Sequence, residues 1–348
     1  MLPDAGVMDI LKEMYLRYPA NHEAVHHMAY EARRAFEEAK KELVMTLAGN
    51  DNYRAVAFSG GTAAISLLGK WKRLQKKQVV TTNLEHPSVD YALKRAGAFC
   101  VRLKTDSGGK IIPDTNTQHA DAVFIHHVQS ELGCVQSVDE LFSNYPGAIK
   151  ITDTIQSAAK MPLPETADIL TVSGSKFGVP GAAALLVKKE YAAEIAALAE
   201  NERSEYLTAR ISIPHFLVMT KVAAMKAKSM ADELEHAKKL QKLCRELAFA
   251  SGIACTVPEE NSSPWICHLN LKKYEGAVIV RLLGNEGICV GSGTACSAET
   301  DKPSAALISL GFRQKEAFGG LRISFSPSTN LYDVKKLFEV LEKTLKNY

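Results

Sequence analysis

The feature that most restricts the fold of this chain is an alternation of short apolar runs with helical patterns, which begins at residue 55. Each run is rich in apolar and β-branched residues and is bounded by Gly, Pro or polar turns. In chain order the runs are AVAF, VVTT, FCVRLK, AVFIHHV, IKITD, ILTVSG and AALLV. Continuous apolar strands separated by helices are typical of a parallel sheet covered on both faces. The pattern predicts a large α/β domain over residues 1–228, doubly wound around a mostly parallel sheet.

The second half of the chain follows a different pattern. A charged helical stretch from Glu190 continues into a long helical segment, which predicts a connector with a domain boundary near Ser229. The expected elements beyond it are strand ICHLNL, helix GAVIVRLLGNEG, strand ICVG, helix PSAALISLG, strand LRISFS and a last amphipathic helix. This mixture predicts a smaller C-terminal α+β domain over residues 229–348. The first residues of the chain can also pack on this smaller domain.

Composition places the chain among globular proteins and argues against polyanionic partners. Hydrophobic residues make up 46% and charged residues 23% of the 348 positions, which is ordinary globular usage. Subtracting 39 acidic from 42 basic residues leaves a net charge of +3. This balance is too small to favour a nucleic acid or an anionic membrane as a partner.

The cysteine pattern indicates in which cellular compartment the protein resides. The seven cysteines include no CxxC pair, so we expect reduced thiols, no zinc site and a cytoplasmic location. Four thiols lie in apolar runs and are expected in the core: Cys100, Cys255, Cys267 and Cys289. The first residues mix acidic and basic side chains, and no run reaches the roughly 18 uncharged apolar residues of a membrane span. We therefore expect neither a secretory leader nor a membrane anchor.

The first chemical signal is the turn Ser59-Gly60-Gly61-Thr62, between an expected strand and an expected helix. Glycine lets the backbone approach a ligand closely, and the free amides of a helix start, with the Thr62 hydroxyl, suit a phosphate group. Taken alone, a tight turn without a ligand explains the motif equally well, since it matches neither the P-loop nor the dinucleotide pattern.

Two further polar groups stand at the ends of apolar runs. Asp153 closes IKITD, where α/β sheets bind ligands, although a helix cap explains this residue as well. Lys176 closes the segment Ser173-Gly174-Ser175-Lys176. A lysine at a strand end is usually a solvated surface residue, but its small neighbours here leave room for the amine to face a cavity.

In chain order, a phosphate turn, His86, Asp153 and Lys176 form the set that an enzyme of pyridoxal phosphate requires. The lysine must be a neutral amine to bond with the cofactor, and burial lowers the pKa of a lysine in that direction. A carboxylate beside the pyridine nitrogen keeps that nitrogen protonated, so the ring accepts electrons. The imidazole of His86 can stack on the ring.

With these motifs the chain resembles the cysteine desulfurase family, within the class V aminotransferases of pyridoxal phosphate fold type I. Seven segments follow the family order over nearly the whole chain: SGGTAAISLL, EHPSV, HVQSELGCVQSV, DTIQSAAKMPL, ILTVSGSKFGVPGAAALLV, GSGTACSAETDKPSAALISLGF and GGLRISFS. Each segment alone is a modest signal, whereas their common order is specific. The resemblance implies the fold of that class and pyridoxal 5'-phosphate as the cofactor.

The resemblance also implies roles for individual residues. Lys176 would carry the cofactor and move the proton of the substrate Cα, and Asp153 would pair with the pyridine nitrogen. Arg322 would clamp the substrate carboxylate with its planar fork, although an arginine in an alternating strand is exposed by default. The other cofactor contacts would come from Gly61, Thr62, His86, Ser130, Gln156, Ser173 and Ser175, with His86 also a catalytic residue.

Cys296 lies in GSGTACSAET, a run of small and polar residues that predicts an exposed loop. In the reaction that the resemblance implies, its thiolate attacks the sulfur of L-cysteine, alanine leaves, and a persulfide remains on Cys296. The distance from Cys296 to LISLGF resembles the branch of the family that usually delivers sulfur to an acceptor protein. We therefore expect a cysteine desulfurase that makes a persulfide for sulfur transfer.

Three departures from the family pattern bear on the substrate. Ser175 stands where the family has a histidine before the lysine. Gln129 and Ser130 replace two asparagines, so the hydrogen bond to the phenolic oxygen of the cofactor is either weaker or made by Gln129. The chain also lacks the small-residue strand with which the family normally opens.

The resemblance further implies a homodimer in which a residue of the second subunit completes the phosphate site, and Thr208 or Arg210 fits that place. His126 and His127 are neighbours on an expected strand and point to opposite faces. We therefore expect them in the core or behind the site, and not as a metal pair.

Two other functions stay open. A class V aminotransferase or a selenocysteine lyase would use the same cofactor site without Cys296. A non-catalytic scaffold would explain Ser175 and Ser130, although the retained Lys176 and Asp153 argue against it.

Overall fold

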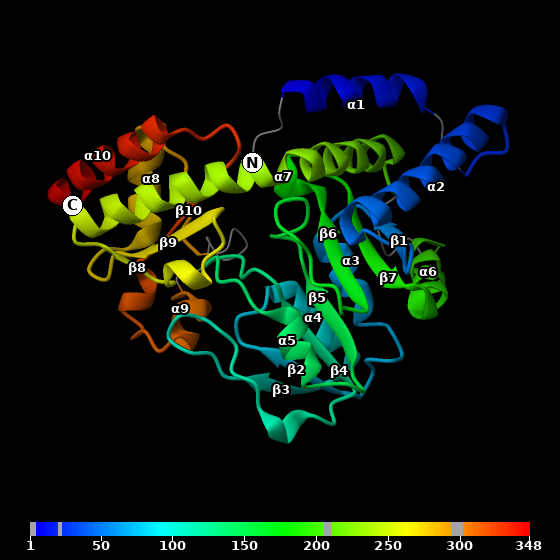
Figure 1. The fold of residues 1–348 in the computed structure, drawn as a ribbon, viewed down its shortest axis with the longest axis horizontal. Helices are drawn as coiled ribbons and strands as arrows, with labels where there is room; N and C mark the ends of the chain where they lie inside the picture. Colours follow the sequence, from blue (N-terminus) through cyan, green and yellow to red (C-terminus); the bar gives the residue numbers. More distant parts are fainter. Residues whose placement is uncertain (1–4, 20–22, 205–210, 294–301) are drawn as a thin grey trace.

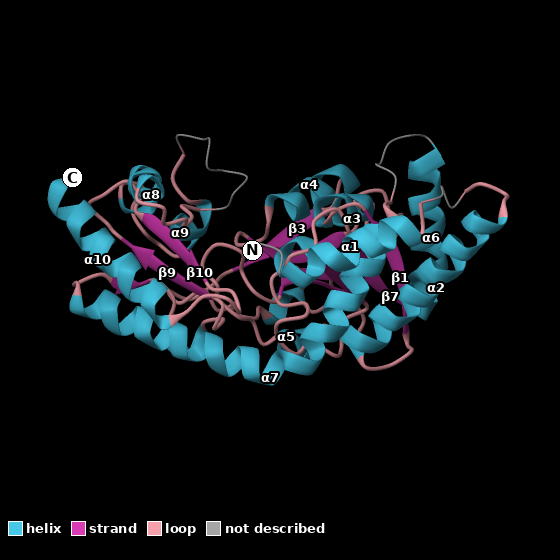
Figure 2. Ribbon diagram, turned by 90° about the horizontal axis from the view of Figure 1, so that it is seen from above, coloured by secondary structure: helices cyan, strands magenta, loops and turns pink. Residues whose placement is uncertain are grey.

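The computed structural model describes residues 5–19, 23–204, 211–293 and 302–348. A larger and a smaller sheet lie side by side, and the long helix α7 (Ile213–Ala250) runs along both of them (Figures 1 and 2). Further helices pack around each sheet.

The larger sheet has seven strands in the order β1-β7-β6-β5-β4-β2-β3. β7 is antiparallel to its two neighbours, and the other pairs are parallel. The strands are β1 (Tyr53–Phe58), β2 (Gln78–Thr82), β3 (Phe99–Leu103), β4 (Ala122–His126), β5 (Ile149–Asp153), β6 (Ile169–Ser173) and β7 (Ala183–Lys188). The predicted mostly parallel α/β sheet is confirmed.

Both faces of this sheet are buried, because successive residues of each strand point to opposite sides. Val80 and Val123 belong to one apolar core, whereas their neighbours Val79 and Phe124 belong to the other. The first core is covered by α1 (Ala5–Arg17), α2 (His27–Ala48), α5 (Val138–Ser143) and the first half of α7. The second core is covered by α3 (Gly61–Leu68), α4 (Pro87–Ala96) and α6 (Lys189–Ser204).

The smaller sheet is antiparallel in the order β10-β9-β8. Its strands are β8 (Ala254–Cys255), β9 (Ile266–Asn270) and β10 (Gly320–Ser324), and its helices are α8 (Gly276–Asn285), α9 (Ala305–Ser309) and α10 (Leu331–Asn347). The apolar face of α10 packs on this sheet and on α7 through Val334, Leu337, Phe338 and Leu341.

Helix α7 belongs to both halves of the molecule. Its first half buries Phe216 and Val218 in the core of the larger sheet, and its second half buries Leu240 and Cys244 in the core of the smaller one. Ser229 lies between these two sets of buried residues. Helix α1 packs against α7 and buries Val7 and Met14 with the larger sheet, and not with the smaller one.

Two expectations about the strands and thiols are wrong. Cys267 is buried and Cys255 is half-buried, but Cys100 and Cys289 are exposed. Cys100 lies on β3, the edge strand of the larger sheet, where Phe99 beside it is exposed too. Cys289 lies in ICVG, which forms no strand, because only Gly291 pairs with a neighbour in an isolated bridge.

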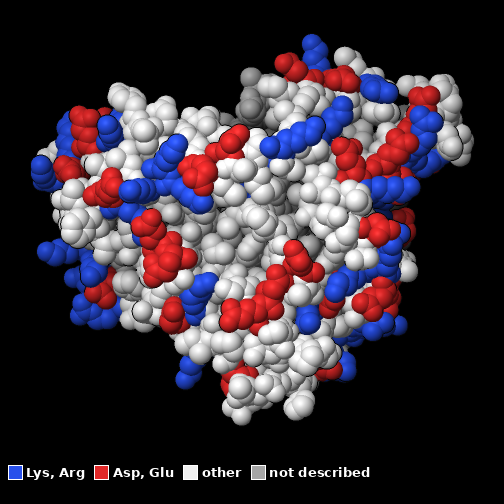
Figure 3. All heavy atoms as spheres, viewed as in Figure 1, with Lys and Arg blue, Asp and Glu red and all other residues white. Residues whose placement is uncertain are grey.

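The surface carries mixed charge. On the face drawn in Figure 3, acidic and basic side chains are interspersed, which agrees with the small net charge. Among the described residues, no helix combines the length and the apolar character needed to cross a bilayer. The described part of the chain also holds no group of three or more His, Cys, Asp or Glu side chains arranged for a metal ion.

Candidate active site

One cavity of about 200 Å³ brings together ten of the eleven predicted site residues. They lie at the carboxyl ends of β5 and β6, at the starts of α3 and α4, and on β10 of the smaller sheet. These residues are Gly61, Thr62, His86, Ser130, Asp153, Gln156, Ser173, Ser175, Lys176 and Arg322. The eleventh, Cys296, lies outside the described residues, as do Thr208 and Arg210.

The start of α3 is shaped for an anion. Gly60 caps the helix in an extended conformation without a side-chain hydrogen bond, so the first backbone amides stay available. A Cβ on Gly61 would lie 2.5 Å from Cδ1 of Ile155 and 3.3 Å from Cβ of Ser173, so only glycine leaves this approach open. The hydroxyls of Ser173 and Ser175 lie 3.0 Å apart beside it.

Asp153 is the last residue of β5 and is held from two sides. Its Oδ1 accepts hydrogen bonds from Thr171 Oγ1 at 2.7 Å and from the amide of Ile155 at 3.0 Å. These donors stabilise the carboxylate and fix its direction, although the residue is only 8% exposed. A buried acid held in this way at a strand end suits a cationic ring nitrogen.

His86 caps the N-terminus of α4 with its ring. Its Nδ1 lies 3.2 Å from the amide of Ser88 and 2.7 Å from the Ser88 hydroxyl. Burial lowers the pKa of His86; the charge of Asp153 opposes this shift and that of Lys176 adds to it. The lowered pKa favours the neutral ring, and His86 lines the cavity.

Lys176 follows β6 on a short 3-10 turn, Gly174–Phe177. A Cβ on Gly174 would lie 2.4 Å from the Val179 carbonyl oxygen, so this turn closes tightly only with glycine. The charge of Lys176 also acts on Lys160, whose pKa is lowered to about 7, chiefly by burial. Lys176 and Arg322 thus place two basic groups around one cavity, as a site for anionic ligands requires.

Arg322 reaches the cavity from β10 and is largely buried, contrary to the default for an arginine in an alternating strand. Its Nη1 donates to the carbonyl oxygen of Ser130 at 2.9 Å, and its Nε is buried with no hydrogen-bond partner among the described residues. Burial lowers the pKa of Arg322, and the charge of Glu131 opposes that shift. A Cβ on Gly291 would lie 3.1 Å from Nη2, so glycine there makes room for the guanidinium group.

Gln129, one of the two expected explanations for the phenolic oxygen of the cofactor, directs its side chain elsewhere. The side chain of Gln129 is already used, because its Nε2 donates to Leu84 O at 3.1 Å and its Oε1 accepts from the amides of Glu131 and Leu132. Gln129 lines a neighbouring cavity, whereas Ser130 lines the site itself.

The sequence reasoning missed one cavity residue of clear interest, His126. It ends β4 beside Asp153 and its Nδ1 lies 2.9 Å from Oε1 of Glu85. His126 and His127 are both buried, at 3% and 8% exposed, as expected for core residues, but His126 also lines the cavity. Only the pairing of β4 with β5 reveals that His126 stands next to Asp153.

A family model described as Aminotransferase class-V matches residues 2–337. The chain belongs to this family. A cysteine desulfurase from Nostoc sp. is 24% identical and covers 97% of this chain and 89% of that relative. An IscS-like cysteine desulfurase from Mycobacterium tuberculosis is 25% identical, covering 92% and 88%. The resemblance to cysteine desulfurases that the seven motifs indicate is therefore confirmed.

Solved structures of a NifS-like protein and of a cysteine desulfurase share the fold. A NifS-like protein superposes with a TM-score of 0.85 at 18% identity, covering 100% of this chain and 97% of that one. The apo cysteine desulfurase of Thermococcus onnurineus has a TM-score of 0.82 at 19% identity, covering 100% and 93%. The arrangement of the two sheets is thus common to these proteins despite low sequence identity.

Proposed function

We propose that this protein is a pyridoxal phosphate-dependent cysteine desulfurase that converts L-cysteine to L-alanine and leaves a persulfide on Cys296. The observation that carries the proposal is the meeting of Lys176, Asp153, His86 and Arg322 in one cavity of a class V chain. The residues that flank the Cys296 segment, among them Gly293 and Lys302, line a second cavity beside the first. Leu84 lies in the walls of both.

The cavity fits the cofactor that the family implies. The approach to the first amides of α3 is kept open at Gly61, as a phosphate needs, and an acid and an amine stand at neighbouring strand ends. Thr62, Ser173 and Ser175 would hold the phosphate with the Gly61 amide, Asp153 would pair with the ring nitrogen, and Gln156 and Ser130 would lie near the phenolic oxygen. When bound, pyridoxal phosphate supplies an electron sink for the Cα–H bond of an amino acid.

The side chains of the chain itself perform the remaining steps. Arg322 binds the substrate carboxylate, and Lys176 removes the Cα proton. The neutral ring of His86 exchanges a proton with the substrate thiol. The Cys296 thiolate then attacks the substrate sulfur, so that an S–S bond forms, the C–S bond breaks, and the carbon skeleton leaves as alanine after protonation.

Purified protein incubated with L-cysteine and a thiol reductant tests this function. We expect sulfide and alanine in equal amounts, and we expect Cys296→Ala to abolish both. Undiminished turnover in Cys296→Ala, or amino transfer to an added keto acid, would instead identify a selenocysteine lyase or an aminotransferase. Loss of visible absorbance in Lys176→Ala would argue against an empty scaffold.

We further propose that the protein works as a homodimer and hands its persulfide sulfur to an acceptor protein. Several large apolar side chains on and near α1 and α2 are exposed, namely Met8, Leu16, Val25, Met28 and Tyr30, which favours a partner surface there. Light scattering after gel filtration measures the mass directly. Completion of the phosphate site by Thr208 or Arg210 of the second subunit, and a cytoplasmic location, stay predictions.

A further inference from the structure

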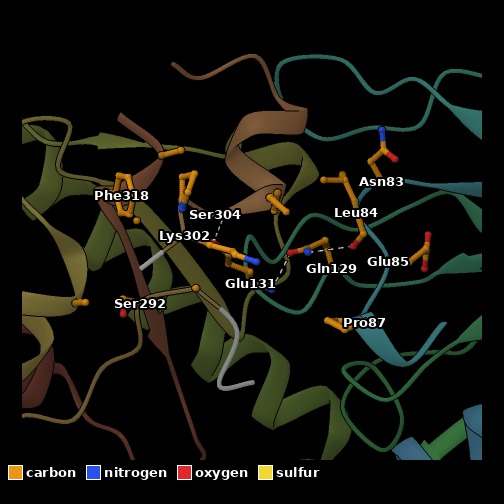
Figure 4. A pocket seen from close by; sticks show the side chains of 17 residues that line it. Asn83, Leu84, Glu85, Pro87, Gln129, Glu131, Ser292, Lys302, Ser304 and Phe318 are labelled. Carbon is orange, nitrogen blue, oxygen red and sulfur yellow. Dashed lines mark hydrogen bonds between the residues drawn. The ribbon is translucent and has the colours of Figure 1, made fainter. Parts of the chain in front are cut away.

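The second cavity, of about 270 Å³, lies between the loop after β4 and the start of α9 (Figure 4). Glu131 occupies the middle of this view, and a dashed line joins it to Ser304. Its carboxyl group is almost completely buried, because only 3% of the residue is exposed. A buried carboxyl group between the two sheets requires an explanation, since burial without partners is unfavourable.

The backbone of Glu131 is fixed from the larger sheet. Gln129 Oε1 accepts hydrogen bonds from the amides of Glu131 at 2.7 Å and Leu132 at 2.6 Å, and its Nε2 donates to Leu84 O. This turn therefore presents the Glu131 side chain in one direction, toward the smaller sheet.

The side chain of Glu131 meets the first turn of α9. Ser304 Oγ donates to Glu131 Oε1 at 2.6 Å and accepts from the amide of Leu307 at 3.1 Å. Ser304 is thus both the cap of α9 and the group that joins this helix to the loop after β4. A charge-assisted hydrogen bond of this length is among the stronger contacts available between the two sheets.

The same carboxyl group lies near the strand partner of Arg322. His268 is the strand partner of Arg322 on β9, and its Nε2 lies 3.9 Å from Glu131 Oε1. Burial lowers the pKa of His268 to about 3, so His268 is neutral. Burial raises the pKa of Glu131, and the hydrogen bond from Ser304 and the charge of Arg322 oppose that shift. Of these neighbours on β9 and β10, Arg322 is therefore the positively charged group that acts on Glu131.

The donors of Arg322 are divided between protein and cavity. Nη1 is fixed on Ser130 O, immediately before Glu131 in the chain, while Nε is buried and finds no partner among the described residues. The guanidinium group is thus held by the Ser130 carbonyl, in the turn that Glu131 ties to α9, and keeps a donor for an incoming carboxylate.

We propose that Glu131 is a positioning residue for Arg322, which fixes the guanidinium group for the carboxylate of an amino-acid substrate and at the same time ties α9 to the loop after β4. The inference deepens the proposed function and rests on it for the identity of the substrate. It assigns Glu131 no contact with the reacting atoms.

The holoenzyme of Glu131→Gln tests the proposal, because glutamine keeps the size and can still accept from Ser304 but carries no charge. We expect the KM for L-cysteine and the dissociation constant for L-alanine to rise about tenfold, because the charge-assisted hydrogen bond from Ser304 that fixes this turn is weakened, while kcat changes less than about twofold. L-Cysteine methyl ester and L-alanine methyl ester lack the carboxylate, so their constants should stay unchanged. In Ser304→Ala the same constants should rise roughly threefold for the two acids and stay unchanged for their methyl esters.

Matched controls lie on the same domain. Glu316→Gln removes an acid of the exposed pair with Arg313, and Ser309→Ala removes a hydroxyl at the other end of α9. Neither should change the preference for acid over ester. An equal loss with acids and esters would show a merely structural role for Glu131, and unchanged constants would show no role; either result overturns the proposal. If Glu131→Gln fails to fold, Ser304→Ala decides by the same comparison.

The proposed function and this inference can fail separately. If the wild-type protein makes no sulfide and alanine from L-cysteine, the proposed function is wrong. Calorimetric binding of L-alanine and of its methyl ester to wild type and Glu131→Gln still decides whether Glu131 serves a carboxylate site.

Discussion

Single residues decide whether the cavity can accept a phosphate. At the start of α3, Gly60 and Gly61 look alike in the sequence but differ in their surroundings. A Cβ on Gly60 would meet nothing within 4 Å, whereas a Cβ on Gly61 would lie 2.5 Å from Ile155. Gly60 is also extended, with a φ of −172°, so any residue can adopt its conformation. The two glycines therefore form a matched pair for experiment.

We expect Gly61→Ala to weaken pyridoxal phosphate binding by about tenfold or more, because overpacking of this kind costs about 1–3 kcal/mol. Gly60→Ala should bind the cofactor within about twofold of wild type, since its methyl group enters open space. Absorbance titration of apoprotein with the cofactor measures both constants. Equal affinity in the two variants would show that the phosphate lies elsewhere.

The chemically obligatory residues were the predictable part of the site. Lys176 and Asp153 stand at strand ends in recognisable motifs, and the structure brings them to one cavity. Glu131, His126 and Gly291 carry no such signal, because their importance depends on contacts between distant segments. The role of Gln129 was also beyond the sequence, since only the turn geometry shows that its amide is already occupied.

Helix α7 connects the half of the molecule that holds Lys176 to the half that holds Arg322. It packs on α1 and α2 at one end and on β8, β9 and α10 at the other. The long connector was predictable from its helical pattern, which runs past Ser229 without a glycine or proline, but its packing on the cores of both sheets was not. By contrast ICVG was expected as a strand from its apolar residues, and it fails to form one since only Gly291 finds a pairing partner.

A proline in the middle of α7 should separate these two halves. Ser229→Pro removes a backbone donor and clashes with the preceding turn, which costs about 3 kcal/mol or more. Ser229→Ala loses the hydroxyl hydrogen bonds to Glu233 at 2.8 Å and to Met225 O at 3.4 Å and should cost about 1 kcal/mol. Urea unfolding measures both, and L-alanine binding should weaken only in the proline variant, because Arg322 moves relative to Lys176. Unaltered binding in Ser229→Pro would mean that α7 does not set this distance.

The whole molecule contains buried histidines whose protonation opposes folding. Burial lowers the pKa of His127 to about 4 and that of His268 to about 3, from the ordinary histidine value of 6.5. The unfolded chain therefore binds more protons than the folded one below pH 6.5, so the free energy of unfolding falls as the pH drops toward 4. Since each pKa unit corresponds to about 1.4 kcal/mol, each histidine should remove about 2 kcal/mol of stability at pH 5.

Replacement of His127 measures this contribution separately from the general loss of stability. His127→Gln removes the 2.9 Å contact with Ser157 and lowers stability at neutral pH, but it also removes the titrating group. The difference in unfolding free energy between pH 7 and pH 5 should therefore shrink by about 2 kcal/mol in urea titrations. His119→Gln, at an exposed histidine, is the control and should keep the wild-type difference. An unchanged difference in His127→Gln would mean that His127 takes up its proton in the folded protein without cost, which its buried place between β4 and Ser157 does not allow.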